Sequence, residues 1–138
     1  FPDSNMPGLD FSFSGVKTAF LYFLRDEVKK NPAFVEENRG DICASLQRHL
    51  VNMLMNRLVQ ATVQTGVKSV AVAGGVSANS ELRKQMQSIG QARGWKVFIP
   101  AFQYCTDNAA MIAMAAHYKY LAGQFSTLDV TPLARMPV

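Results

Sequence analysis

The sequence has 138 residues, of which 49% are hydrophobic and 17% charged, and this composition indicates one folded domain rather than a disordered chain. The longest apolar run, residues 109–116, is too short to span a bilayer, and two cysteines exclude a disulfide framework and are typical of a reducing, cytoplasmic environment. The net charge of +4 is compatible with an RNA partner, but solvated helix faces carry such residues too, so charge alone identifies no partner.

The first predicted element is a half-buried strand over residues 9–14. Hydrophobic and polar residues alternate there, so that Phe11 and Phe13 point to one face and the polar residues to the other. A helix is predicted over residues 16–30, because its apolar residues share one broad face. Pro32 is expected to end this helix, since the residue before a proline avoids the helical conformation.

A long helix is the next predicted element. The polar residues 36–40 are expected to form a loop, and Asp41 is a suitable N-cap for a helix over residues 41–65. Apolar residues cover more than half of its circumference, so other elements are expected to cover it from two sides. His49 lies on this helix as a lone histidine, which is typical of a surface or packing residue.

A strand, a glycine pair and a helix follow in close succession. The strand is predicted over residues 69–73, and Asn79 or Ser80 can cap a helix over residues 80–93. Between them, residues 74–75 are both glycine, and a turn of bare backbone N–H groups suits a phosphate or another anion. The glycines are equally explained by close packing of strand and helix. The spacing differs from GxGxxG and no Gly-Lys-Ser/Thr follows, which argues against a P-loop or dinucleotide site.

The last predicted elements are a strand over residues 96–99 and an alanine-rich helix over residues 109–122. Thr106 can cap this helix, which would place Asp107 in its first turn, and the alanine face is expected to approach a neighbouring element closely. The remaining tail is expected to lie on the surface. The order β-α-α-β-α-β-α indicates an α/β layered domain.

Both polar turns are expected at the same edge of the sheet, because a right-handed β-α-β unit makes its two strands parallel. Asn79 and Asp107 would then border one crevice. The Asn79 amide suits a ribose, a phosphate or an acyl group, and the Asp107 carboxylate suits a metal or an incoming amine. An aspartate at a helix start is also favoured by the helix dipole alone, so the spacing leaves both explanations of Asp107 open.

Three motifs taken together resemble the tRNA threonylcarbamoyladenosine transferase family, the TsaD family, formerly called glycoprotease or O-sialoglycoprotein endopeptidase. The motifs are DFSFSGVKTA (residues 10–19), AGGVSANSELR (residues 73–83) and CTDNAAMIA (residues 105–113). The resemblance covers the whole chain and corresponds to the C-terminal part of a family member. Since the first residue is Phe1 rather than Met, the chain is expected to be part of a longer protein.

The resemblance implies the α/β fold of the actin-like ATPases, which includes sugar kinases, Hsp70 and actin. Members of this fold have two ribonuclease-H-like lobes around a cleft. Residues 1–138 are therefore expected to form a single, truncated domain that makes up most of the C-terminal lobe.

The resemblance also implies an activity and the residues that serve it. The family moves a threonylcarbamoyl group from threonylcarbamoyl-adenylate to the adenosine next to the anticodon of tRNA. The family's nucleotide-contacting asparagine falls on Asn79, with Gly74 and Gly75 beside the phosphate and ribose. No residue of this chain is assigned to the catalytic step itself.

The family's metal, one divalent iron or zinc ion, is held by one aspartate and by two histidines of a His-x-x-x-His motif. The aspartate falls on Asp107, but the chain contains no His-x-x-x-His, because His49 and His117 are isolated. The two histidine ligands are therefore expected to come from outside this chain.

The resemblance thus implies a cytoplasmic acyltransferase that acts with the family's partner subunits. This chain alone is expected to be inactive and to self-associate. The alternatives are an assembly or regulatory module without catalysis, a sugar-kinase-like phosphotransferase, and the metallo-glycopeptidase of the older family name. The motifs argue against a kinase, and the absence of HExxH or an activated nucleophile argues against a peptidase.

Overall fold

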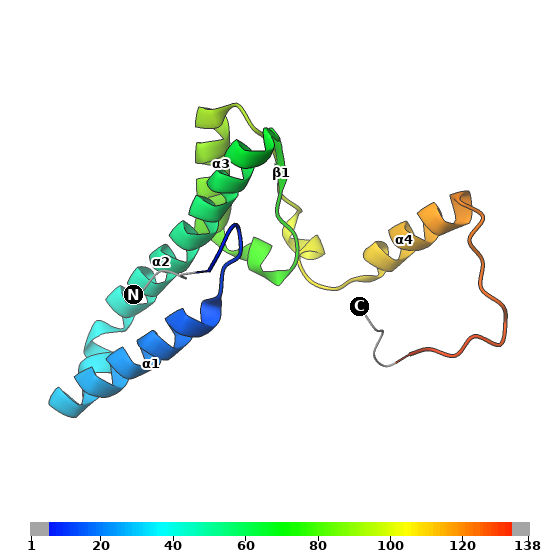
Figure 1. Ribbon diagram of the computed structural model, residues 1–138. Helices are drawn as coiled ribbons and strands as arrows, with labels where there is room; N and C mark the ends of the chain where they lie inside the picture. Colours follow the sequence, from blue (N-terminus) through cyan, green and yellow to red (C-terminus); the bar gives the residue numbers. More distant parts are fainter. Residues whose placement is uncertain (1–5, 134–138) are drawn as a thin grey trace.

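The computed structural model describes residues 6–133 as an α/β chain that is mostly helical with a small parallel sheet (Figure 1). Among these residues no helix is long and apolar enough to cross a membrane. The elements, with short 3-10 helices marked η, are α1 (Phe13–Lys30), α2 (Phe34–Thr65), β1 (Ser69–Ala71), η1 (Gly75–Ala78), α3 (Ser80–Arg93), β2 (Lys96–Phe98), η2 (Phe102–Tyr104) and α4 (Ala109–Leu121).

The prediction of a strand over residues 9–14 is wrong. The side chain of Ser12 accepts a hydrogen bond from the backbone N–H of Ser14 at 3.3 Å and caps α1, so the helix begins inside the predicted strand. A strand needs a neighbour for its backbone groups, and the described sheet contains only β1 and β2. The segment before α1 is instead held on α2 by Arg57, which donates to the carbonyl oxygen of Gly8 at 2.8 Å.

The prediction of a loop over residues 36–40 is also wrong, and Asp41 is not an N-cap. The helix α2 begins earlier and includes both, whereas α1 ends at Lys30 as predicted. Glu36 and Glu37 lie in the first turn of α2, where negative charge is favourable beside the helix dipole. The polar stretch therefore forms an exposed first part of the helix rather than a break.

The core lies between α2, α3 and one face of the sheet. Its buried members are Val51, Met55, Val70, Leu82 and Met86. The helix α2 contacts α1 as well as α3, which confirms that it is covered from two sides (Figure 1). The strands β1 and β2 pair in parallel, as predicted, although each is shorter than expected. On the opposite face of the sheet Phe98 remains 49% exposed.

The helix α3 is bounded and packed as its sequence favours. Asn79 caps it by accepting a hydrogen bond from the backbone N–H of Leu82 at 3.0 Å, and Gly94 ends it with a φ of 66°. Gly90 lies in the last turn of α3, against β2. A Cβ atom at Gly90 would overlap the Cγ2 atom of Val97, so the absence of a side chain sets how closely α3 approaches the sheet.

The helix α4 extends away from the other elements, as the orange ribbon in Figure 1 shows, and all of its residues are exposed. The expected close packing of its alanine face is therefore wrong for this chain, in which two three-residue strands offer little surface to cover. Thr106 is not its cap. Asn108 takes that role by accepting from the backbone N–H of Met111 at 3.3 Å, which leaves Asp107 outside the helix. The described tail after α4 is exposed, as predicted.

Candidate functional site

The glycine turn (residues 74–79) follows β1 and leads into α3. Gly74 has a φ of 77° and a ψ of 179°, a backbone conformation that is nearly restricted to glycine. In the described chain the backbone N–H groups of Gly75 and Val76 make no hydrogen bond. A Cβ atom at Gly74 or Gly75 would meet nothing within 4 Å, so close packing does not explain this glycine pair. The turn therefore offers free donors in open space beside a helix N-terminus, which is the arrangement that binds anions.

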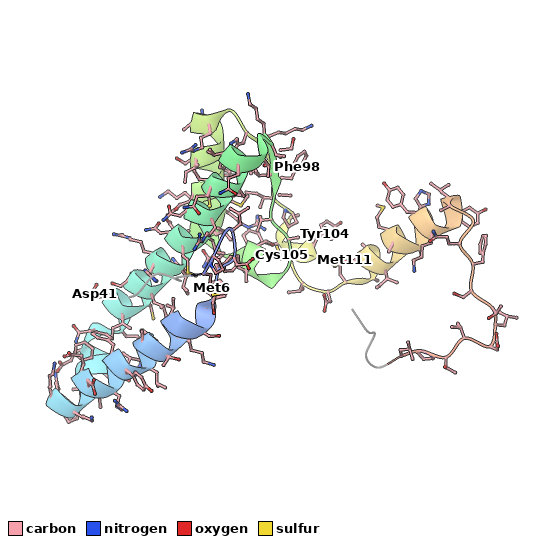
Figure 2. The ribbon with its side chains drawn as sticks, in the orientation of Figure 1. Met6, Asp41, Phe98, Tyr104, Cys105 and Met111 are labelled. Carbon is pink, nitrogen blue, oxygen red and sulfur yellow. The ribbon has the colours of Figure 1, made fainter. Side chains whose placement is uncertain are left out.

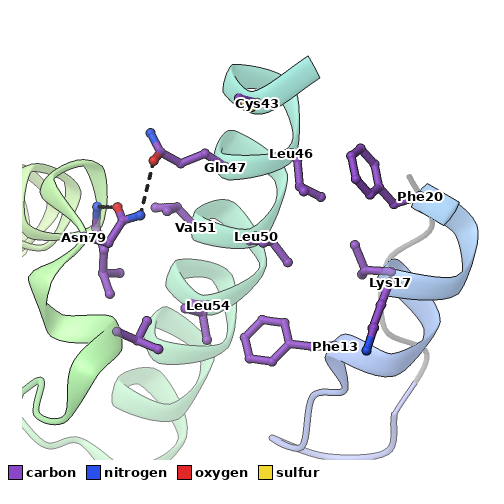
Figure 3. Close-up of a pocket in the computed structure, with 13 residues that line it drawn as sticks. Phe13, Lys17, Phe20, Cys43, Leu46, Gln47, Leu50, Val51, Leu54 and Asn79 are labelled. Atoms are coloured by element: carbon purple, nitrogen blue, oxygen red, sulfur yellow. Dashed lines mark hydrogen bonds between the residues drawn. The ribbon is translucent and has the colours of Figure 1, made fainter. Parts of the chain in front are cut away.

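The side chain of Asn79 lies where this turn meets α2. Its Oδ1 atom caps α3, and its Nδ2 atom donates a hydrogen bond to Oε1 of Gln47 at 3.2 Å (Figure 3). An amide nitrogen carries two hydrogens, and within the described chain Gln47 uses only one of them. Asn79 is thus held in place and keeps a donor for a ligand.

A pocket of about 550 Å³ lies between α1, α2 and the glycine turn (Figure 3). Its walls are mainly apolar, with Phe13 and Phe20 from α1 facing Leu50 on α2, and Lys17 and Asn79 add a cation and an amide. This volume falls within the range of small-molecule sites, about 300–1,000 Å³. The sequence did not reveal the pocket, because its lining comes from α1, α2, the glycine turn and α3.

The structure places Asp107 elsewhere. It is exposed, follows η2 and does not line the pocket that contains Asn79. The parallel pairing of β1 and β2 does confirm that the two turns follow the same edge of the sheet. That Asn79 and Asp107 border one crevice stays a prediction.

The described residues do not form a metal site by themselves. Among them no three histidine, cysteine, aspartate or glutamate side chains are grouped so that they could hold an ion. His49 lies on α2 and His117 on α4, and Asp107 is exposed between η2 and α4. A transition metal needs three or four ligands, so any site at Asp107 requires residues from outside this part of the chain.

Arg83 on α3 connects the two turns. The charge pattern predicts that Arg83 and Lys84 only solvate a helix face, which is wrong for Arg83 because its side chain is partly buried. Its Nε atom donates to the carbonyl oxygen of Ser77 at 2.6 Å, and one terminal nitrogen donates to the carbonyl oxygen of Pro100 at 2.7 Å and to Sγ of Cys105 at 3.1 Å. The guanidinium also lies over the ring of Phe102, 4.0 Å from its centroid. Figure 2 shows Cys105 where the chain leaves the other elements toward α4.

Comparison with known proteins gives one consistent result. The sequence profile of a family described as "TsaD: tRNA N6-adenosine threonylcarbamoyltransferase" matches residues 1–114. Curated relatives with the name tRNA N6-adenosine threonylcarbamoyltransferase are 51% identical over 138 residues in Cytophaga hutchinsonii, 51% over 135 residues in Riemerella anatipestifer and 49% over 138 residues in Porphyromonas gingivalis. These alignments cover 100%, 98% and 100% of this chain but 40% of each relative.

Proposed function

The chain belongs to the tRNA N6-adenosine threonylcarbamoyltransferase family, and we propose that it is part of an enzyme that transfers a threonylcarbamoyl group from threonylcarbamoyl-adenylate to the adenosine next to the anticodon of tRNA. The observation that carries this proposal is the glycine turn, whose free N–H groups and Asn79 donor suit a nucleotide phosphate and ribose. Because the chain spans 40% of its relatives, the activity is assigned to the full-length protein that contains it.

We propose that residues 1–138 make up most of the C-terminal, ribonuclease-H-like lobe of an actin-like ATPase fold, and that they form a single domain. The parallel β1–α3–β2 arrangement, with both turns at one sheet edge, supports this assignment. The rest of the full-length protein would add strands to this short sheet and supply the other wall of the cleft.

In the proposed reaction the exocyclic amine of the adenosine attacks the carbonyl carbon of the threonylcarbamoyl group. A carbon–nitrogen bond forms, the bond from that carbon to the phosphate oxygen breaks, and adenosine monophosphate leaves while the amine loses a proton. The N–H groups of Gly75 and Val76 and the N-terminus of α3 are suited to stabilise the phosphate charge that develops on the leaving group. Asn79 would orient the nucleotide through its remaining Nδ2 hydrogen.

We further propose that Asp107 supplies one ligand to a divalent iron or zinc ion, with two histidines and the remaining coordination provided from outside this chain. The exposure of Asp107, which caps no helix, leaves its carboxylate accessible to such a partner. We also propose that the full-length protein acts in the cytoplasm, in a complex with the partner subunits of its family.

The experiment compares the full-length protein with residues 1–138 alone. Each is incubated with threonylcarbamoyl-adenylate, tRNA and the family's partner subunits, and the tRNA nucleosides are then analysed by mass spectrometry. Modified adenosine is expected with the full-length protein and not with residues 1–138, which contain one side of the cleft. A full-length protein that modifies no tRNA would refute the proposed function, and modification by residues 1–138 would refute the assignment of half a site to this chain.

A further inference from the structure

Arg83 reaches two segments that are distant in the sequence. Its guanidinium donates to Ser77 in the glycine turn. It also donates to Pro100 and Cys105, which follow Arg83 by 17 and 22 residues. These partners follow β1 and β2 respectively, so one side chain joins the two turns at the same edge of the sheet. No other hydrogen bond of the described residues joins these two turns.

The segment made of η2 and the residues before α4 (residues 102–108) is joined to the glycine turn by this contact. Its other hydrogen bonds within the described chain are local. Tyr104 and Cys105 donate to carbonyl oxygens of Ala101 and Phe102, and Asn108 donates to Thr106 and accepts from the N–H of Met111. All residues of α4, the helix that follows, are exposed. Within the described residues, Arg83 therefore supplies the hydrogen bond that joins this segment to a distant part of the chain.

The contact requires an arginine. The Nε atom and one terminal nitrogen serve acceptors on two different segments, while the flat face of the guanidinium stacks on Phe102. A lysine has one nitrogen and no planar face, so it cannot reproduce both bonds together with the stacking. The acceptors are shielded from water, because Ser77 is 0% exposed and Cys105 is 2% exposed, so water does not readily replace the guanidinium.

We propose that Arg83 is a positioning residue for the transfer reaction. By tying the glycine turn to residues 102–108, it sets the position of Asn79 relative to Asp107, which follows Cys105 by two residues. This inference rests on the proposed function, in which Asn79 contacts the nucleotide and Asp107 supplies a metal ligand. Without Arg83, Asn79 still binds the nucleotide and Asp107 still binds the metal. The two residues are then no longer held at the distance and orientation that the reaction needs.

The test uses Arg83→Met in the full-length protein, because methionine keeps the apolar stem and removes every donor. The expected result is a fall in kcat for threonylcarbamoyl transfer of about ten- to a hundredfold per folded molecule. The KM for threonylcarbamoyl-adenylate is expected to change by less than about threefold, since a residue that only positions does not bind substrate. Amide hydrogen exchange is expected to accelerate in residues 102–108.

The matched control is Arg93→Met at the other end of α3, where the guanidinium lies 5.8 Å from the ring centroid of Trp95 and contacts neither turn. This variant is expected to keep the wild-type kcat and the wild-type exchange of residues 102–108. If Arg83→Met does not fold, Arg83→Lys replaces it, because lysine keeps the positive charge. Lysine cannot make both hydrogen bonds and the stacking contact, so losses in kcat and in exchange protection are expected from this variant too.

The proposal needs both readouts. A variant at Arg83 whose kcat per folded molecule stays within about twofold of wild type overturns it, and so does a loss of kcat without faster exchange in residues 102–108. If the wild-type full-length protein transfers no threonylcarbamoyl group, the proposed function fails, and exchange then decides alone. Faster exchange in residues 102–108 would support the positioning contact, and unchanged exchange would overturn it.

Discussion

Asn79 uses the two ends of one side-chain amide for two different contacts. The oxygen caps α3 through the N–H of Leu82, and the nitrogen reaches Gln47 on α2. The cap stabilises the helix, whereas the nitrogen is the group proposed to meet the nucleotide. Because the two ends have separate roles, substitutions can separate the contribution to stability from the contribution to binding.

Asn79→Asp keeps the capping oxygen and loses the donor, and Asn79→Ala loses both. In the full-length protein, Asn79→Ala is expected to lower the free energy of unfolding by about 1 kcal/mol, and Asn79→Asp by less. Both are expected to lower turnover more than about tenfold, because both lack the donor. Urea denaturation and initial rates measure the two effects. Turnover that falls only for Asn79→Ala, in step with stability, would leave Asn79 as a helix cap and nothing more.

Asp107 has a proposed role in metal binding but no visible role in stabilising the fold. It is exposed and outside α4, and Asn108 provides the cap. Asp107→Asn in the full-length protein is therefore expected to leave the melting temperature within about 2 °C of wild type, as for a surface substitution. Bound iron or zinc, measured by mass spectrometry of the purified protein, is expected to be lost together with activity.

A matched control for this substitution is Asp26→Asn, since Asp26 is an exposed aspartate on α1 next to Lys29. It is expected to keep full metal content and activity. Retention of stoichiometric metal by Asp107→Asn would remove Asp107 from the ligand set.

At the scale of the elements, the packing of α3 on the sheet depends on Gly90. Gly90→Ala would normally stabilise a helix by up to about 1 kcal/mol, but the added Cβ atom overlaps Val97 on β2. Overpacking of this kind costs about 1–3 kcal/mol, so a net loss of stability is expected. Gly40→Ala in α2 is the control, because its Cβ atom would meet nothing within 4 Å and a gain of about 0.4–1 kcal/mol is expected. Urea midpoints that rise for both variants would contradict the close contact between α3 and β2.

The elements that the sequence predicted well are those that local chemistry determines. Asn79 and Gly94 bound α3, and the glycine turn follows a strand, because caps and glycine turns depend on neighbouring residues only. The strand over residues 9–14 failed because a strand depends on a distant partner, and residues 6–133 provide none for it. The loop over residues 36–40 failed because polar composition alone does not break a helix.

The candidate site was predictable to a similar extent. The resemblance and the turn chemistry pointed to Gly74, Gly75 and Asn79, which the structure gathers in one turn. The pocket beside them and the contacts of Arg83 could not be predicted, because they join elements that are far apart in the sequence. A periodic pattern identifies which face of a helix is apolar but not which distant segment that face will meet.

For the whole molecule, the main feature is apolar surface that no other described residue of the chain covers. Exposed apolar side chains occur on α1, on the outer face of the sheet and along α4, where Leu21, Phe98 and Ile112 are 62%, 49% and 74% exposed. The chain spans 40% of the length of its curated relatives, and we expect the rest of a full-length protein to cover these surfaces.

Residues 1–138 alone are expected to self-associate, because apolar patches and unpaired strand edges rarely remain bare in water. The simplest form is a symmetric dimer that buries the exposed helix face or pairs the strand edges. Light scattering at low micromolar concentration is expected to give a mass above that of the single chain and rising with concentration. A well-folded monomer throughout would contradict this account of the uncovered surfaces.

We propose that the glycine turn of this chain forms the nucleotide side of a threonylcarbamoyl-transfer site. The most direct measurement follows product formation by the full-length protein and its Asn79→Asp variant, with threonylcarbamoyl-adenylate, tRNA and partner subunits present. One adenosine monophosphate is expected to be released for each modified adenosine. The rate is expected to be at least about tenfold lower for the variant, in which α3 is still capped. Equal rates for the two proteins, or no modified adenosine from either, would contradict this proposal.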